Sequence, residues 1–324
     1  MTLAVGVIGL GVMGAEHLRI LREETAGVRV TAICDADPER SAQLAQGAKV
    51  IADPRALIRS DEVEALVIAS PDATHADLAI ACLSAGKPSL CEKPLATSAS
   101  DALRVVEKEV ELGRRLLQIG YMRRFDPAYV EMKQLAVGGQ IGAPVVLHNT
   151  HRNAAAPDWF TGAMAVTNSF VHEIDISRWL LDAEMATAFV NQASGGDPVF
   201  ITMETEKGEI VSTEVFMNAH YGYHVHAQLV GRFGTVQMAQ PSDIVTNKRS
   251  HHGHLWPVNW VPRFRNAYRI QMAAWVQSIE TGCPAGASAW DGYVATAIAE
   301  QVVIAMKGTQ KTKLLIGARP ALYA

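Results

Sequence analysis

Three glycines close to the N-terminus constrain the fold of this chain more than any other feature of its sequence. They follow the apolar run Leu3–Ile8 and open a helical pattern over Val12–Glu24. In a strand–turn–helix unit the first glycine permits the tight turn, the second lets the backbone approach a phosphate, and the third lets helix and strand pack closely. A helix N-terminus also favours an anion. We therefore predict a dinucleotide site at Gly9, Gly11, Val12, Met13 and Gly14.

An acidic residue indicates which dinucleotide this turn prefers. Asp35 follows the second apolar run, Val28–Cys34, and lies about 20 residues after Gly14, where such sites place a carboxylate. That carboxylate accepts hydrogen bonds from ribose hydroxyls and repels a 2′-phosphate, so NAD is preferred over NADP. Arg40, in the first turn of the next helix, could soften the preference but is expected in solvent. The alternatives are FAD binding and a glycine turn that binds no ligand.

The first 120 residues alternate short apolar runs with helical patterns. This alternation is typical of right-handed βαβ units, so we predict a doubly wound parallel sheet, a Rossmann domain, over residues 1–120. The expected strands are Leu3–Ile8, Val28–Cys34, Ala65–Ala69, Pro88–Cys91 and Leu116–Ile119. The expected helices are Val12–Glu24, Pro38–Gln46, Thr74–Ala85 and Ser98–Leu112.

The pattern changes in the second part of the chain, where strands follow one another with few helices. We predict an α+β domain over residues 121–324, built on one large, mainly antiparallel open sheet. Its expected strands are Pro144–Arg152, Thr187–Asn191, Val199–Thr205, Glu209–Asn218, Val225–Gly231 and Thr235–Ala239, with hairpin turns at Lys207-Gly208 and Phe233-Gly234. Its expected helices are Asn168–Leu181, Arg263–Thr281 and Trp290–Met306, and the last two could pack back on the first domain. Gly195-Gly196 and the histidine-rich residues 250–254 are expected in surface loops.

Composition and charge exclude several classes of protein. Apolar residues make up 49% of the chain and charged residues 19%, and no apolar run approaches the roughly 18 residues of a membrane span. With a net charge of −4 and no basic block, nucleic acid is not an expected partner. The first residues have the pattern of a strand and not of an export signal, and the four cysteines show no metal spacing. We therefore expect a cytoplasmic protein with reduced thiols.

Three polar clusters are expected where ligands would meet the chain. Ser70-Pro71 and His75 follow the strand Ala65–Ala69, Glu92-Lys93-Pro94 follows the next strand, and His172-Glu-Ile-Asp175 lies in the helix of the second domain. Ligands of an open α/β sheet bind beyond the carboxyl ends of its strands, so the first two clusters border the cofactor crevice. The third cluster must face that crevice if the second domain closes it.

Together these motifs resemble the glucose–fructose oxidoreductase/inositol dehydrogenase family, nearly from end to end of the chain. Within that family the chain most resembles the inositol 2-dehydrogenases. Glu-Lys-Pro directly after the expected strand Pro88–Cys91 is the most diagnostic motif. The resemblance also rests on Gly9–Gly14, Ser70-Pro71 with His75, Gly120–Asp126, His172–Asp175 with Arg178-Trp179, and Ser288–Gly292. It implies an NAD-dependent dehydrogenase that oxidises a secondary hydroxyl of a cyclic polyol or sugar to a ketone.

The resemblance also implies roles for individual residues. His172 would be the general base that takes the hydroxyl proton, and Lys93 would stabilise the negative charge that develops on the reacting oxygen. Asp175, one helical turn after His172, could orient it. Pro94 would shape the turn, where the family often has a cis peptide bond. Substrate contacts are expected from Arg123, His151, Asn153, Asn168 and His172, and further cofactor contacts from Ser70, Pro71, His75, Glu92 and Lys93.

One position departs from the family pattern. Inositol dehydrogenases usually carry Asp four residues before the catalytic histidine, where this chain has Asn168. An amide still binds a hydroxyl, but it supplies no negative charge to the base. An aldose, a glycoside or an anhydrosugar is therefore the alternative substrate, and a non-catalytic NAD-binding sensor is the alternative of another class.

The remaining expectations concern metals and partners. His224 and His226 share a strand face, and His251, His252 and His254 lie close together, but no carboxylate or cysteine stands at ligand spacing, so no metal is expected. The loop histidines and Trp256 could instead cap the substrate cleft. The family often assembles through its open sheet face, so a homotetramer or homodimer is expected.

Overall fold

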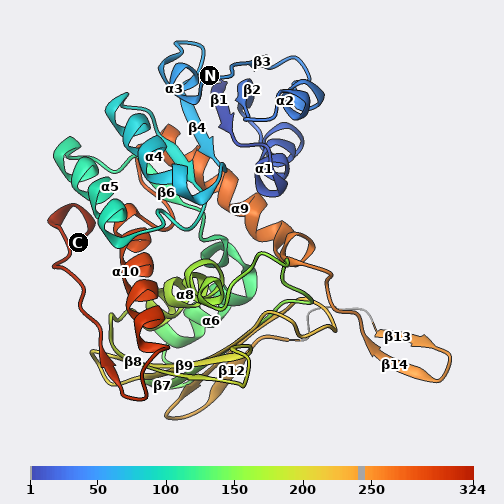
Figure 1. Cartoon of the computed structure of the whole chain (residues 1–324), viewed down its shortest axis with the longest axis vertical. Helices are drawn as coiled ribbons and strands as arrows, with labels where there is room; N and C mark the ends of the chain where they lie inside the picture. Colours follow the sequence, from blue (N-terminus) through green and yellow to red (C-terminus); the bar gives the residue numbers. More distant parts are fainter. Residues whose placement is uncertain (1, 240–244) are drawn as a thin grey trace. The chain divides into compact units, whose positions relative to one another are not determined.

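The computed structural model describes residues 2–239 and 245–324. Its chain divides into two compact units (Figure 1). Unit 1 comprises Met1–Phe125, Asn266–Ala297 and Gly317–Ala324, and unit 2 comprises Asp126–Arg265 and Ile298–Ile316. The chain therefore leaves unit 1 twice and returns to it twice.

Unit 1 is built on a six-stranded sheet in which all neighbouring strands are parallel. In spatial order the strands are β3 (Lys49–Val50), β2 (Val28–Cys34), β1 (Leu3–Ile8), β4 (Ala65–Ile68), β5 (Ser89–Cys91) and β6 (Leu117–Ile119). The residues of β4 and β5 are all buried, as expected for parallel strands covered on both faces. The predicted doubly wound sheet is confirmed.

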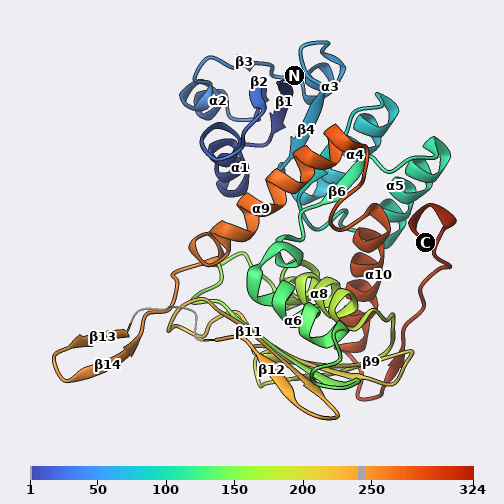
Figure 2. The ribbon, with the colours of Figure 1, turned by 180° about the vertical axis from the view of Figure 1, so that it is seen from behind.

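Helices cover both faces of this sheet. Helix α4 (His75–Ser84) packs on α5 (Ala99–Leu112) on one side, and α1 (Val12–Glu23) lies with α9 (Trp260–Thr281) on the other (Figures 1 and 2). The remaining elements are the short helices α2 (Pro38–Leu44) and α3 (Pro54–Arg59), the turns η1 (Asp72–Thr74), η2 (Met122–Phe125) and η4 (Ala321–Tyr323), and α10 (Ala289–Ala305).

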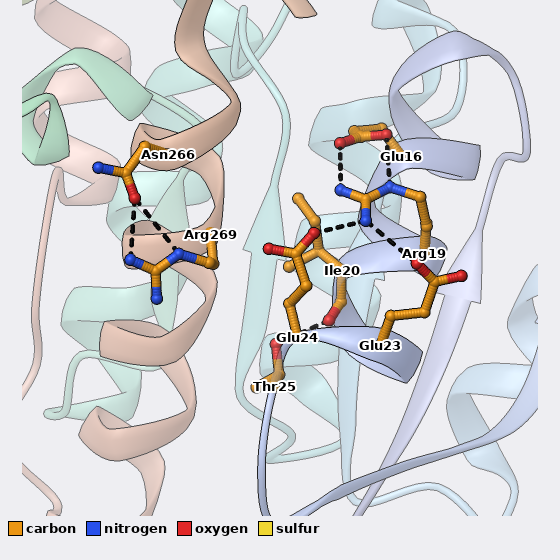
Figure 3. A network of polar contacts seen from close by, with 8 residues as sticks. All are labelled: Glu16, Arg19, Ile20, Glu23, Glu24, Thr25, Asn266 and Arg269. Atoms are coloured by element: carbon orange, nitrogen blue, oxygen red, sulfur yellow. Dashed lines mark hydrogen bonds and ion pairs between the residues drawn. The ribbon is translucent and has the colours of Figure 1, made fainter. Parts of the chain in front are cut away.

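The outer surface of α1 carries a network of charged side chains (Figure 3). The guanidinium of Arg19 donates to the carboxylates of Glu16, at 2.7 Å, and Glu23, at 3.2 Å, and to that of Glu24. These acceptors, Glu16 first and then Glu24, raise the pKa of Arg19 above its already high ordinary value. The network ties together the last two turns of the helix that begins at the glycine-rich turn.

Unit 2 is built on a seven-stranded mixed sheet. In spatial order its strands are β12 (Thr235–Gln237), β11 (His224–Gly231), β7 (Pro144–Arg152), β10 (Ile210–Phe216), β9 (Val199–Thr205), β8 (Met185–Gln192) and β15 (Thr312–Lys313). All neighbours are antiparallel except β7 and β10, which are parallel. The predicted α+β architecture with a mainly antiparallel sheet is confirmed.

The helices of unit 2 differ from the prediction in two respects. The sequence predicts a single α-helix over Asn168–Leu181, whereas α8 begins at Val171 and ends at Leu181. Residues Ala165–Phe170 (η3) form a π-helical turn before it, and the short helix α7 (Gly162–Met164) precedes that turn. Periodicity alone does not separate a π turn from an α turn. Helix α6 (Pro127–Val137), which the sequence analysis missed, packs on α8.

The histidine-rich residues 250–254 are not a simple loop, so that prediction was wrong. Strand β14 (His251–His254) pairs with β13 (Val245–Lys248), and the two form a hairpin that extends away from the seven-stranded sheet (Figures 1 and 2). The predicted strand Thr235–Ala239 ends earlier, at Gln237. Within the described residues no helix is long and apolar enough to cross a membrane.

Candidate active site

The glycine-rich turn of unit 1 is shaped by contacts that only glycines allow. Gly9 has φ +87°, and a Cβ atom placed there would lie 2.4 Å from the backbone nitrogen of Ser70. A Cβ atom on Gly14 would lie 1.9 Å from the carbonyl oxygen of Gly9. A Cβ atom on Gly11 would meet nothing within 4 Å, because this residue faces open space at the start of α1. Val12 is exposed beside it and Met13 is half-buried.

Asp35, at the end of β2, is held against this turn. Its carboxylate accepts hydrogen bonds from the backbone nitrogens of Leu10, at 2.5 Å, and Asp37, at 2.8 Å. Arg40 donates to the same carboxylate at 3.3 Å and forms an ion pair with Asp37 at 3.3 Å. Arg40 is exposed, as the sequence suggested, and its guanidinium contacts these two acidic neighbours.

A cavity of about 920 Å³ opens beside these groups within unit 1. It lies beyond the carboxyl ends of β1, β2 and β4, and its lining includes Gly9, Gly11, Asp35, Ser70, Pro71 and Thr74. This volume falls in the range of cofactor and ligand sites. The glycine backbone, the anion-favouring helix start and the carboxylate therefore meet at one cavity, and their chemistry fits a dinucleotide with a free ribose diol.

His75 does not extend into this cavity. Its ring is buried, and its two nitrogens face two backbone carbonyl oxygens, Nδ1 that of Pro94 at 2.7 Å and Nε2 that of Ser70 at 2.8 Å. The ring thus links the loop after β4, which lines the cavity, to the turn that carries Lys93. His75 therefore supports these two loops, and the direct contact with a cofactor that the sequence analysis expected stays a prediction.

Glu92 is also buried, directly before Lys93. Its carboxylate accepts hydrogen bonds from Nε2 of His17, at 2.7 Å, and from the backbone nitrogen of Lys93, at 3.2 Å. Burial acts to raise the pKa of Glu92, but the hydrogen bond from His17 and the charges of His17 and Lys93 outweigh burial and lower it. The carboxylate is therefore ionised at neutral pH. Lys93 itself is half-buried, and the Lys93–Pro94 peptide bond is cis.

His17 was missed from the sequence, although a signal was present. The buried positions of α1 are Gly14, His17, Leu18, Ile20 and Leu21, so His17 occupies an inward position of an otherwise apolar face. A histidine at such a position needs a polar partner. No motif singles it out, because its partner Glu92 lies 75 residues away.

Adjacent arginines follow β6 and have different surroundings. Arg123 is buried within η2. Arg124 forms an ion pair with Asp291 at 3.0 Å, within unit 1. Arg124 is thus engaged in a structural contact.

In unit 2 a polar cluster is buried between α8 and the inner face of β7. Nδ1 of His151 lies 3.0 Å and 3.1 Å from the two carboxylate oxygens of Glu173, and both side chains are buried. The centres of the His172 and His151 rings lie 6.4 Å apart. The ring of Tyr223 packs edge-on against that of His151, with 5.8 Å between the ring centres. The structure thus brings His151 and His172 together and adds Glu173, whose role the sequence analysis did not recognise.

Asn153 and Asn168 belong to irregular parts of unit 2. Asn153 lies just beyond the end of β7. Its side-chain oxygen is buried and has no hydrogen-bond partner among the described residues. Asn168 is half-buried in the π-helical turn before α8. Asp175 is buried one turn after His172 on α8.

The other histidines do not form a metal centre. His224 is hydrogen-bonded to the hydroxyl of Tyr221 at 2.7 Å and stacks on Trp256 at 4.0 Å between ring centres, and burial lowers its pKa to about 4. Nδ1 of His252 faces Asn247 of the same hairpin at 2.8 Å. No group of three metal-binding side chains occurs among the residues that the structure describes.

Comparison with known proteins agrees with this geometry. A model of an oxidoreductase family with an NAD-binding Rossmann fold matches residues 3–121, and the model of that family's C-terminal alpha/beta domain matches residues 133–314. The chain belongs to this oxidoreductase family. The expected family and the expected class, an NAD-dependent oxidoreductase, are therefore confirmed.

Individual members of the family are similar over their whole length. Inositol 2-dehydrogenase 1 of Saccharopolyspora erythraea is 47% identical, with 100% of this chain and 99% of the relative covered. Inositol 2-dehydrogenase of Paracoccus denitrificans is 39% identical, with 100% of both chains covered. A solved myo-inositol dehydrogenase of Lactobacillus casei, in complex with NAD(H) and myo-inositol, is 29% identical with a TM-score of 0.95 and 100% of both chains covered.

Proposed function

We propose that this chain is an inositol dehydrogenase, which oxidises one secondary ring hydroxyl of a cyclic polyol to a ketone with NAD. The observation that carries the proposal is its end-to-end similarity to inositol 2-dehydrogenases, at up to 47% identity, together with Lys93 and His172. A polyol offers hydroxyls and little apolar surface. The buried imidazole, carboxylate and amide groups around His172 suit such a ligand.

The cavity of unit 1 supports NAD as the cofactor and disfavours NADP. When bound, NAD supplies the acceptor for the hydride that leaves the ring carbon. Gly9, Gly11 and the first turn of α1 would receive the pyrophosphate, because a glycine carries no side chain to hold a phosphate away from the backbone and the N-terminus of a helix favours an anion. Asp35 binds the ribose hydroxyls and would repel a 2′-phosphate.

The two chemical roles fall to His172 and Lys93. An imidazole titrates near neutral pH and so suits a base that removes the hydroxyl proton as the hydride departs. The lysine donates a hydrogen bond to the same oxygen, so that negative charge developing there is stabilised. Ser70 and Pro71 line the cofactor cavity, and Glu92 and His75 support the turn that holds Lys93.

Recognition of the ring falls to the remaining polar groups. The buried side-chain oxygen of Asn153 accepts a hydrogen bond from a ring hydroxyl, and His151, oriented by Glu173, contacts another. Arg123 and Asn168 supply further donors. Because Asn168 lacks the charge of the usual aspartate, an inositol isomer other than myo-inositol, or a sugar, is the second candidate.

NADH formation measured across inositol isomers, aldoses, glycosides and anhydrosugars tests this proposal. Turnover is expected with at least one cyclic polyol, and His172→Ala is expected to lower kcat about 10²–10⁴-fold. His148→Ala, which changes an exposed histidine of β7, is the matched control and should leave kcat unchanged. Absence of turnover on every compound, with NAD binding shown separately, would contradict the proposal and favour an NAD-binding sensor.

The outward face of the unit 2 sheet supports a homo-oligomer, either a dimer or a tetramer. Phe200 of β9 and Ile210 of β10 are exposed there, while the alternating residues of both strands are buried. Open sheet faces that expose apolar side chains are common sites of contact between chains. Light scattering is expected to give a mass of two or four chains, and a single-chain mass would contradict this expectation.

A further inference from the structure

The turn that carries Lys93 is flanked on both sides by buried histidines from two different helices of unit 1. Before Lys93, the carboxylate of Glu92 meets Nε2 of His17 on α1 at 2.7 Å. After Lys93, the carbonyl oxygen of Pro94 meets Nδ1 of His75 at the start of α4, also at 2.7 Å. The two histidines are 0% and 1% exposed, so neither has water as an alternative partner.

The contact on the first side fixes the backbone of Lys93. Because Glu92 is ionised, Nε2 of His17 must donate to it, and the same carboxylate accepts the backbone N–H of Lys93 at 3.2 Å. A third neighbour confines the carboxylate, since a Cβ atom on Gly120 would lie 2.9 Å from its carboxyl carbon. Glu92 therefore has little room to move while His17 is in place.

The contact on the second side joins the turn to the cofactor cavity. The ring nitrogens of His75 face the carbonyl oxygens of Pro94 and Ser70 at 2.7 Å and 2.8 Å. A single ring thus lies between the Lys93 turn and the loop that lines the cavity. Helix α1, which carries His17, likewise begins at the glycine-rich turn of the same cavity.

We propose that His17 and His75 are positioning residues that hold the Glu92-Lys93-Pro94 turn in place and couple it to the two loops that bind the cofactor. The role of Lys93 in this proposal rests on the proposed function, but the positioning itself does not. Apolar residues often replace a buried ionic pair without loss of stability, so folding alone does not call for a histidine–glutamate pair directly behind Lys93.

A matched set of variants separates positioning from folding. His17→Leu removes the donor to Glu92, and His17→Gln restores a donor in its place. Leu18→Ala, at the neighbouring buried position of α1, opens a cavity without touching this pair and so reports the effect of lost stability alone. His75→Leu releases both Pro94 and Ser70.

Two measurements then apply to each variant. With the preferred polyol, His17→Leu is expected to lower kcat on the order of 10- to 100-fold, the effect of a small displacement of a catalytic group, while His17→Gln recovers most of it. Hydrogen–deuterium exchange of the peptide spanning residues 89–97 is expected to be faster in His17→Leu than in wild type, and close to wild type in His17→Gln. His75→Leu is expected to weaken NAD binding as well.

Leu18→Ala is expected to lower Tm while leaving both kcat and the exchange of residues 89–97 at wild-type values. Wild-type exchange and kcat in His17→Leu, or parallel losses in His17→Leu and Leu18→Ala, would overturn the proposal. If the wild type oxidises none of the polyols or sugars, the proposed function fails, and the exchange measurement still tests the positioning.

Discussion

Asp35 illustrates how one side chain serves both the shape and the selectivity of the cofactor site. Its carboxylate accepts the backbone N–H groups of Leu10 and Asp37, so it closes the glycine-rich turn from the side of β2. The same carboxylate lines the cavity of unit 1. Arg40 donates to this carboxylate at 3.3 Å.

Replacing this carboxylate should change the cofactor preference. Asp35→Ser is expected to raise the Kd for NAD about tenfold, because a charge-assisted hydrogen bond contributes about 1.5 kcal/mol or more. The Kd for NADP should fall, since Arg40 is released toward the cavity. Fluorescence titration with both dinucleotides measures the change, and Glu39→Gln, on the exposed first turn of α2, is the control. An unchanged ratio of the two Kd values would contradict this role.

At the residue scale the sequence identifies the groups that belong to motifs and misses their partners. Asp35 stands at a spacing from the glycine-rich turn that has a chemical meaning, and Lys93 and His172 belong to motifs on which the family resemblance rests, so all three were predicted as site residues. His17 and Glu173 act through contacts with Glu92 and His151, and no local pattern signals a contact between side chains far apart in the chain.

At the scale of elements, α5 is joined to the C-terminal residues by a buried carboxylate. Glu109 accepts the backbone N–H groups of Leu116 and Leu117, both at 2.7 Å, and the hydroxyl of Tyr323, also at 2.7 Å. Burial raises the pKa of Glu109 above its ordinary value of 4.5, and it raises that of Tyr323 as well. The folded state therefore holds the Glu109 proton more tightly than the unfolded chain does.

Because the pKa of Glu109 is raised in the folded state, its contribution to the stability of the protein falls as the pH rises. The stability that Glu109 contributes to the fold is fully present below pH 4.5, the pKa of its carboxyl group in the unfolded chain. It is lost as the pH rises through the raised pKa of the folded state. Glu109→Gln keeps an acceptor for the two backbone groups and removes the titration. The stability of this variant relative to wild type should therefore increase as the pH rises above 4.5.

Urea unfolding at a series of pH values measures this difference. Glu111→Gln, an exposed position of the same helix, should show no such trend. A difference between Glu109→Gln and wild type that is constant with pH, or that decreases as the pH rises, would show that the buried carboxylate does not titrate as described.

The sequence predicts best the strands that are long enough to show a clear apolar pattern. Strands β1, β2, β7 and β9 have the predicted bounds, since each is a run of at least six residues with a clear apolar pattern. Strand β3 has two residues and α3 has six, too few for any periodicity. The π-helical turn and the β13–β14 hairpin depend on backbone hydrogen bonds that the residue types do not specify.

At the scale of the whole molecule, each of the two units contains a different set of the candidate site residues. Unit 1 contains the cofactor cavity and the braced turn of Lys93, and unit 2 contains the buried cluster of His151, His172 and Glu173. The change from alternating strands and helices to consecutive strands predicted this division. The sequence offered packing of the last two helices on the first domain only as an option, because helix patterns do not state which sheet they cover, and Asn266–Ala297 belongs to unit 1.

The central claim is that the chain removes a hydride from a ring carbon of an inositol. The most direct measurement uses myo-inositol deuterated at carbon 2, with mass spectrometry of the NADH formed and His172→Ala as the control. The account predicts that the deuterium appears in the NADH and that the variant forms almost none. Turnover that yields only unlabelled NADH would place the oxidation at another carbon, and no NADH from any inositol isomer would contradict the claim itself.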